Sequence, residues 1–245
     1  MSTDELFHPE QLRPANYICT PDPRSVGIVT PDREAGGWRQ LEVADLHRAV
    51  ATYKLNSGVP EDIVIHFDTA KNLYLYAWFV YRFYPVAEHH ALACLELALR
   101  ERYEKEKIPK EKYYPRSKFP TLWSFLHYAE DKGDIKNEGF KRWHEVAECR
   151  ARTRYEDEKD DEMLNKGLDR IEIDYSEVQV TDIDRNFDYI NKLIGYLPKL
   201  RNDYAHGSKT LHNRVLGTIQ VVSEIINQIY PETTMSPSDT VISPE

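Results

Sequence analysis

An arginine and a histidine lie close together near the carboxyl end of the sequence, with polar residues around them. The segment KLRNDYAHGSK, residues 199–209, contains Arg201, Asn202 and His206, and a glycine follows the histidine at once. A guanidinium is a planar fork that matches the oxygens of a phosphate, and an imidazole titrates near neutral pH. These groups are therefore suited to binding a phosphate and to moving a proton beside it.

The same segment also has a purely structural interpretation, because the helix macrodipole favours a cation near a helix carboxyl end. On an unbroken helix, five steps would place Arg201 and His206 roughly 140° apart around the axis. The two side chains converge only if the helix ends between them, and Gly207 is suited to the left-handed position just beyond such an end. We expect Ser208 or Thr210 to cap the next helix, so that Arg201 and His206 meet at a concave corner.

The chain from residue 61 onward has the periodicity of helices, and the corner joins the last two. Apolar residues at steps of three and four are clearest on either side of the corner, at 187–197 and 211–229. Residues 168–182 alternate weakly and are predicted to be a connecting loop or short strand. The other predicted helices lie at 61–84, 85–107, 119–133 and 138–167. The sequence predicts an all-α fold, an up-and-down helical bundle over residues 61–230.

The two ends of the sequence differ from this helical part. Residues 1–60 contain five prolines before residue 32, and we expect an irregular N-terminal extension with a helix at about 41–56. A short strand is expected in SVGIVT, residues 25–30. Residues 231–245 are rich in Ser, Thr and Pro, and are predicted to be a disordered tail.

Composition limits the classes of function. The chain of 245 residues carries a net charge of -9, which argues against wrapping a long nucleic acid but not against gripping one or two phosphates. The three cysteines, Cys19, Cys94 and Cys149, have no metal-site spacing, so we expect no metal site and a reducing compartment.

No segment predicts contact with a membrane. The amino end has no apolar core of a signal peptide. The most apolar run, residues 73–87, is interrupted by Arg82 and Pro85 and is shorter than the roughly 20 residues that span a bilayer. We therefore expect a cytoplasmic protein.

In its full context the corner resembles the motif of the HEPN family, named for higher eukaryotes and prokaryotes nucleotide-binding. HEPN domains are helical bundles in which an Arg, a polar residue and a His lie between the last two main helices. RNDYAHG, residues 201–207, fits that pattern, and HHALACLELALRERY, residues 89–103, resembles the second helix of the family's bundle. The resemblance covers about residues 61–230.

Members with an intact motif are often metal-independent endoribonucleases, frequently toxins or defence effectors, that act as homodimers with two motifs facing each other. The resemblance implies that Arg201 and Asn202 bind phosphate, with Lys209 adding to substrate binding, and that His206 is an acid or base. RNA would then be cut by its own 2′-OH, with no cofactor. The implied setting is toxin–antitoxin, stress or phage defence, with RNA, a second copy, and an antitoxin or other regulatory protein as partners.

Two other interpretations stay open. The chain could be a non-catalytic HEPN-like module that binds a nucleotide or a partner protein, and its acidic balance favours that alternative because RNA is steered poorly to a negative surface. It could also be a helical interaction protein whose motif is only a cap. Some family toxins carry a Tyr two residues after the His that a partner nucleotidyltransferase modifies. Here that position is Ser208, so this control is not expected.

Residues near the motif are candidates for supporting it. We expect Glu88 to lie near the cleft and help hold Arg201, and Asp203 and Tyr204 to support the motif side chains. His89 and His90 are adjacent, so on a helix they point about 100° apart and are poor joint metal ligands. We expect one of them to face a neighbouring helix and the other to face solvent.

Overall fold

The computed structural model describes residues 7–32 and 34–232, most of which lie in helices, and this confirms the all-α class. Two short strands, β1 (Val29–Pro31) and β2 (Trp38–Gln40), pair in antiparallel fashion. The helices are α1 (Val43–Ala51), α2 (Glu61–Tyr76), α3 (Phe83–Tyr103), α4 (Lys110–Tyr113), α5 (Leu122–Lys132), α6 (Lys141–Lys166), α7 (Asp182–Arg185), α8 (Tyr189–Ala205) and α9 (Leu216–Ile229).

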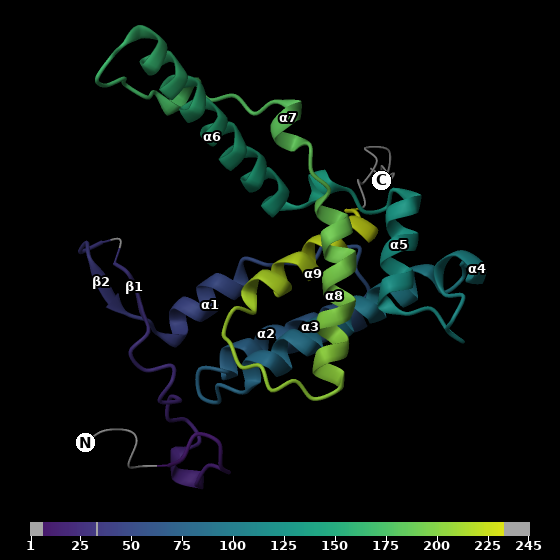
Figure 1. The fold of residues 1–245 in the computed structure, drawn as a ribbon. Coiled ribbons are helices and arrows are strands. Elements are labelled where there is room, and N and C mark those ends of the chain that lie inside the picture. Colours follow the sequence, from purple (N-terminus) through teal and green to yellow (C-terminus); the bar gives the residue numbers. More distant parts are fainter. Residues whose placement is uncertain (1–6, 33, 233–245) are drawn as a thin grey trace, which may run out of the picture.

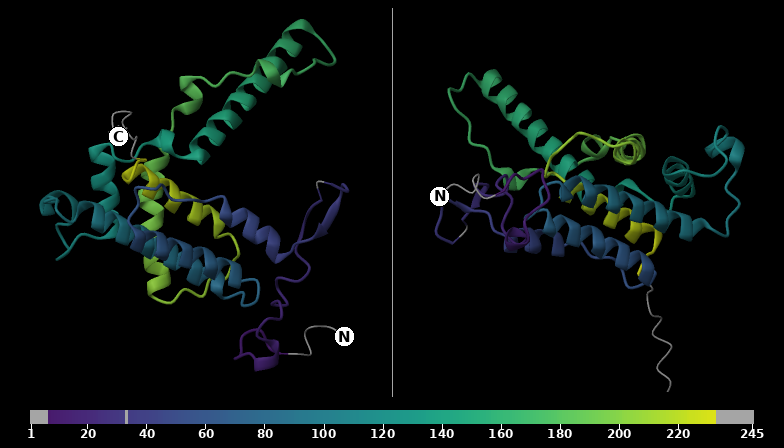
Figure 2. Two further views of the ribbon diagram at one scale, coloured as in Figure 1. Left: turned by 180° about the vertical axis from the view of Figure 1, so that it is seen from behind. Right: turned by 90° about the horizontal axis from the view of Figure 1, so that it is seen from below.

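Helix α3 lies at the centre and contacts α2, α5, α8 and α9. Figure 1 shows α2, α3 and α9 running alongside one another, whereas α8 runs across them. The right-hand view of Figure 2 shows α8 end-on, on the opposite side of α3 from α2. Helix α8, which carries the motif, is therefore positioned by the face of α3 that α2 leaves free.

Apolar residues on each helix bury the face that meets α3. On α3 itself Leu92, Leu95 and Leu99 are fully buried, and small alanines on the same helix allow neighbouring backbones to approach closely. Helix α9 adds Ile219 and Val222 to the same core. Because α3 is covered on several sides, its few polar residues that lie inside must find partners on α8 or α9.

The first helix predicted for the bundle ends earlier than expected. A helix was expected through residue 84, but α2 ends at Tyr76 and α3 begins at Phe83. The fully buried Asp22 explains the break, because its carboxylate accepts a hydrogen bond from the Tyr81 backbone N–H (3.2 Å) and its own N–H donates to the Trp78 carbonyl (3.0 Å). A continuous helix would use these backbone groups internally.

Part of the expected N-terminal extension packs against the bundle. The helix predicted at 41–56 is α1, and its Leu46 and Val50 belong to the core. The backbone N–H of Asn56 donates to Oδ1 of Asn227 on α9 (2.8 Å). The strand predicted in residues 25–30 is confirmed only at its last two residues, where β1 begins.

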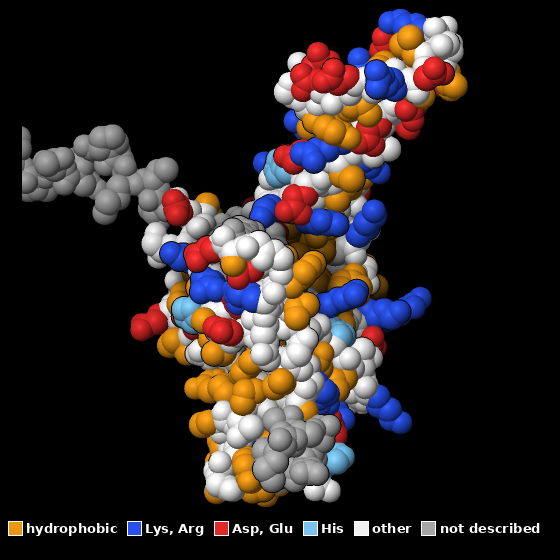
Figure 3. Space-filling model, turned by 90° about the vertical axis from the view of Figure 1, so that its left-hand side faces the viewer, with side chains coloured by type: hydrophobic (Ala, Val, Ile, Leu, Met, Phe, Trp, Pro, Cys, Tyr) orange, Lys and Arg blue, Asp and Glu red, His pale blue; other side chains and the backbone are white. Residues whose placement is uncertain are grey.

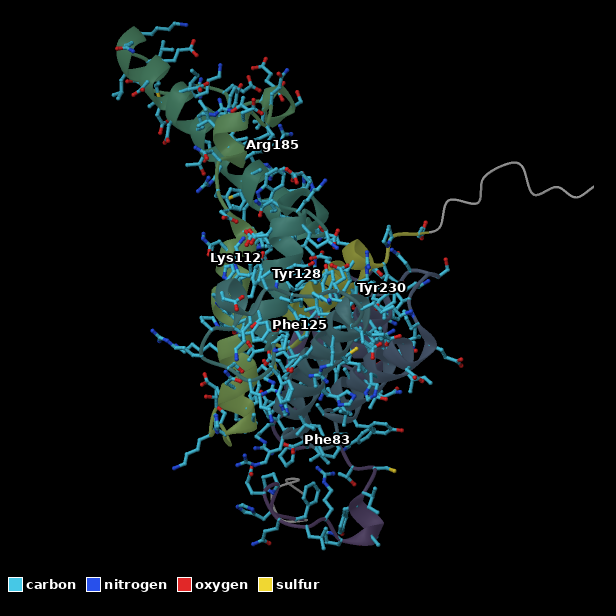
Figure 4. All side chains as sticks on the ribbon, turned by 90° about the vertical axis from the view of Figure 1, so that its right-hand side faces the viewer. Phe83, Lys112, Phe125, Tyr128, Arg185 and Tyr230 are labelled. Atoms are coloured by element: carbon cyan, nitrogen blue, oxygen red, sulfur yellow. The ribbon has the colours of Figure 1, made fainter. Side chains whose placement is uncertain are left out.

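Helix α5, which was predicted over residues 119–133, spans Leu122–Lys132. Thr121 is its N-cap, and Gly133 ends it with φ 71°. On its buried side, Tyr128 packs edge-on against Tyr103 and Tyr113, with ring centroids 5.2 and 5.4 Å apart. Figure 4 labels Tyr128 on this helix. Helix α5 also contacts α8, and its first residues lie beside Arg201 and Asn202.

Helix α6 projects from the bundle as an arm (Figure 1). Its buried residues, Trp143, Ala147 and Ala151, all lie in its first half, and its charged second half is exposed or only partly buried. Residues 168–182 return beside it without a strand, and an ion pair between Arg154 and Asp184 (2.9 Å) joins α6 to α7.

Two further predictions concern membranes and the tail. Among the described residues, no helix has both the length and the apolar character needed to cross a membrane. The tail predicted to be disordered begins at residue 231, and residues 233–245 lie outside the described residues.

We predict that Leu95→Ala lowers the free energy of unfolding by about 2–5 kcal/mol, because it leaves a cavity in the most enclosed helix. The matched control is Leu164→Ala on the arm, where the side chain is 73% exposed and the change should stay within about 0.5 kcal/mol. Urea denaturation measures both. Equal losses in the two variants would contradict the central place of α3.

Candidate functional site

Helix α8 carries the three motif residues in and just beyond its last turn. A stripe of buried residues including Ile190, Ile194 and Leu197 packs it against α3 and α5. Asp188 caps its first turn by accepting from the Asn191 backbone N–H (3.0 Å). The helix is thus anchored at its amino end and along one face, which leaves its carboxyl end to present polar side chains.

The corner after α8 has the backbone that the sequence predicts. His206 is the C-cap, with its N–H donating to the Asn202 carbonyl (3.0 Å), and Gly207 follows with φ 86°. The expected cap of the next helix is wrong, because α9 begins only at Leu216. The Ser208 hydroxyl instead accepts from the Thr210 backbone N–H (3.1 Å), which forms a local turn in place of a helix start.

Arg201 is held by an acid on the central helix. Its Nη2 lies 3.0 Å from Oε2 of Glu96, whose other oxygen accepts from Arg100 on the same helix. The Arg201 side chain is 35% exposed, and its Nη1 lies 3.4 Å from Oδ1 of Asn202. Nε of Arg201 is buried without a hydrogen-bond partner in the described part of the chain. A guanidinium has five N–H donors, and Glu96 and Asn202 take up only two of them.

A small cavity of about 180 Å³ lies beside this guanidinium. It is lined by Arg201 and Asn202 from α8, by Glu96 from α3, and by Thr121 and Trp123 at the start of α5. The space is large enough for a phosphate group or a few water molecules. Arg201 and Asn202, which the sequence predicts to bind phosphate, are thus brought to one cavity.

His206 lies outside this cavity. It is exposed at the corner, and within the described ranges no hydrogen bond or ion pair joins it to Arg201. Lys209 and Asp203 are also exposed. One copy of the chain therefore brings Arg201 and Asn202 together and leaves His206 and Lys209 facing solvent.

The charge of Arg201 affects the pKa of His89 on α3. Burial lowers the pKa of His89, and the positive charge of Arg201 lowers it further. His90, the adjacent residue, contacts His66 on α2, with ring nitrogens 3.4 Å apart. His89 lies near Tyr204 on α8, and His90 contacts α2. Both histidines are partly buried, whereas one of them was expected to face solvent.

Glu88 contacts Tyr204 rather than Arg201. It is only 1% exposed, and its carboxylate accepts hydrogen bonds from Tyr204 (2.5 Å) and Thr218 (2.5 Å). Nε2 of His212 lies 3.6 Å from the same carboxylate and 3.3 Å from the Tyr204 hydroxyl. Burial and the Glu88 carboxylate raise the pKa of Tyr204. This cluster joins α3, the end of α8, the loop after it, and α9.

Three residues that contact the candidate site residues were not predicted from the sequence. Glu96 binds Arg201, and His212 and Thr218 contact Glu88. A signal was present for Glu96, because an acid between two leucines in an otherwise apolar stretch of α3 needs a partner. For His212 and Thr218 the sequence carries no comparable signal, since their contact depends on how α9 crosses α3.

The chemistry open to this site follows from its donors. Arg201 and Asn202 can bind an anion, and an exposed imidazole stands at the corner. Within the described residues, no group of three His, Cys, Asp or Glu side chains is arranged to hold a metal ion. Comparison with models of protein families, with curated proteins and with solved structures finds no match to this chain.

We predict that Arg201→Gln raises the pKa of His89, because removal of a nearby positive charge favours the imidazolium. The imidazole chemical shifts measured against pH by NMR report this pKa. The matched control is Arg100→Gln, which removes the other arginine on Glu96 and should leave the titration in place. An unchanged His89 pKa in Arg201→Gln would show that the guanidinium lies elsewhere.

The same shift predicts how stability depends on pH. Because the pKa of His89 in the folded protein lies below its ordinary value of about 6.5, the unfolded chain takes up this proton first as the pH falls. The stability contributed by neutral His89 is present above about pH 6.5 and is lost as the pH falls below it. In His89→Gln, the decline in the free energy of unfolding between about pH 7 and pH 5 should be shallower than in the wild type. An equally steep decline would contradict the assignment.

We predict that Glu88→Ala lowers the free energy of unfolding by about 1–3 kcal/mol, because the Tyr204 and Thr218 hydroxyls lose their acceptor inside the protein. The matched control is Glu101→Ala, which removes an exposed carboxylate from the same helix and should change little. Chemical denaturation measures both. A Glu88→Ala protein as stable as the control would contradict the role of the cluster.

Proposed function

We propose that this protein is a HEPN-like, metal-independent endoribonuclease that acts as a homodimer in the cytoplasm. Arg201 and Asn202 would bind the phosphate to be cut, and Lys209 would contact the strand nearby. The helices from residue 61 to 230 would form the family's bundle, with the two corners of a dimer facing each other. A toxin–antitoxin, stress or phage-defence role fits such an activity.

The reaction needs a base, an acid and a cation beside one phosphate. The base takes the proton of a ribose 2′-OH, whose oxygen attacks the adjacent phosphorus, and the bond from phosphorus to the 5′-oxygen breaks. The acid gives a proton to that 5′-oxygen, and a 2′,3′-cyclic phosphate remains. In the proposed dimer, His206 of one copy serves as base and the same residue of the second copy serves as acid. Arg201 stabilises the charge that develops on the phosphate oxygens.

The proposal rests on the surroundings of Arg201, which combine an ion pair, exposure to solvent and an adjoining cavity. Arg201 forms an ion pair with Glu96, is partly open to solvent, and lines a phosphate-sized cavity with Asn202. An arginine that served only as a helix cap would need neither the cavity nor unused donors. His206 stands exposed only a few residues further along, where a second copy can reach it.

Local charge also supports an anionic substrate. The chain as a whole is acidic, but residues 192–214 carry five Lys or Arg side chains and a single acid, Asp203. The five are Lys192, Lys199, Arg201, Lys209 and Arg214. A local positive field of this kind attracts a polyanion to the corner even where the net charge does not.

The alternative function is a HEPN-like module that binds a nucleotide or a partner protein without cutting RNA. It is favoured by the Glu96 carboxylate, which partly neutralises Arg201, and by the position of His206 outside the cavity. The two functions differ in one property, because only the nuclease needs the His206 imidazole.

We predict that the purified protein cuts single-stranded RNA in the presence of EDTA and leaves 2′,3′-cyclic phosphate ends. His206→Ala should lower the rate at least about 100-fold, because a general acid–base group is lost. Gel analysis of end-labelled RNA and mass spectrometry of the products measure rate and chemistry. The matched control is His47→Ala, an exposed histidine on α1 that should leave the rate unchanged. RNA left intact by the wild type, or cut equally by His206→Ala, would support the non-catalytic module instead.

A further inference from the structure

A second cavity lies on the other side of α8 from Arg201. Its volume is about 790 Å³, within the range of ligand pockets. The walls are α8, the start of α6, and α9 with the loop before it. Lys192 lines this cavity and lies nine residues before Arg201, which places the two on opposite faces of the helix. The cavity is therefore separate from the proposed cleavage site.

The rim of the cavity is positively charged. Lys192 and Arg214 are exposed and form no ion pair with the acids of the described residues, while Arg142 is paired with Glu145 at 3.2 Å. Figure 3 shows the side of the molecule that lies to the left in Figure 1. Lys and Arg side chains gather along its right-hand edge, below the α6 arm and next to hydrophobic side chains. Unpaired cations at a cavity mouth favour an anionic ligand.

The acid at the cavity does not oppose this charge strongly. Glu88 lines the cavity, but its carboxylate is buried and already accepts hydrogen bonds from Tyr204 and Thr218. Hydrogen-bonded neighbours disperse the negative charge of a buried carboxylate and occupy its lone pairs. Lys192 and Arg214 therefore set the sign of the charge that an entering ligand meets.

An exposed aromatic ring, that of Tyr196, lines the same cavity as Lys192 and Arg214. Tyr196 is 54% exposed, and no described aromatic ring stacks on it, whereas the nearby Tyr189 packs edge-on against Phe140. Leu193 and Val221 add an apolar floor. An exposed tyrosine above an apolar floor is a surface on which a planar ring can stack, and each stacked base is worth about 1–3 kcal/mol.

We propose that this cavity binds a nucleoside phosphate, with the base stacked on Tyr196 and the phosphate held by Lys192 and Arg214. The ligand is a free nucleotide or one nucleotide of a single strand, since both present the same base and phosphate. The site binds without cutting, and it does not depend on the Arg201 and His206 chemistry. The Glu88–His212 contact at 3.6 Å connects its wall to the loop after the corner.

The test measures binding of two probes to the full chain. One probe is AMP, followed by calorimetry, and the other is a fluorescein-labelled hexanucleotide with 2′-O-methyl riboses, which cannot be cut because it lacks the attacking hydroxyl. Lys192→Glu combined with Arg214→Glu should weaken binding at least about tenfold. Tyr196→Ala should also weaken it, and Tyr196→Phe should retain it because the ring remains.

Control variants separate this site from charge in general and from cleavage. Lys110→Glu combined with Arg116→Glu changes charge by the same amount at exposed positions away from the cavity, and should leave binding unchanged. His206→Ala should bind both probes like the wild type, whatever its nuclease activity. Binding of the strand alone would identify a subsite for RNA, and binding of AMP with competition between the probes would identify a nucleotide site. Absence of binding by both probes, or equal weakening in the control pair, would overturn the proposal.

Discussion

The burial of the Glu88 carboxylate constrains the whole carboxyl half of the bundle. A charge taken out of water is costly unless hydrogen bonds replace its hydration. Here the replacement comes from Tyr204 at the end of α8 and from Thr218 on α9, while Glu88 itself belongs to the central helix. Helices α8 and α9 can therefore shift relative to α3 only by exposing or orphaning this carboxylate. The corner with Gly207 lies between the two helices, and its position follows from the same contacts.

Because α8 is held in this position, two of its faces each line a cavity. On one face Arg201 pairs with Glu96 beside a small cavity, and on the other face Lys192 and Tyr196 line a larger one. The two acids of α3 hold neighbouring turns of α8, because Glu96 binds Arg201 and Glu88 binds Tyr204 three residues later. A phosphate at Arg201 and a base at Tyr196 would thus meet groups held on one rigid helix.

Local signals in the sequence predict the all-α class and several helix ends, because capping depends on a few neighbouring residues. Gly207 takes the left-handed conformation expected of it, and Gly133, the last residue of a predicted helix, takes the same conformation. Features that depend on distant contacts escape prediction. The break between α2 and α3 depends on Asp22, about sixty residues earlier, and the partner of Arg201 lies on another helix. Spacing along the chain identifies Arg201 and His206 as candidates, but it cannot show which acid approaches the guanidinium.

The central claim is that Arg201 and His206 act on one phosphate. A crystal structure of the protein with a bound 2′-O-methyl RNA strand tests it most directly. We predict a phosphate oxygen within hydrogen-bond distance of the Arg201 guanidinium, with a His206 imidazole, from the same or a second copy, beside the ribose 2′-oxygen or the 5′-oxygen. A strand whose phosphates avoid Arg201, with Glu96 as the guanidinium's sole anionic contact and His206 remote from the backbone, would contradict it.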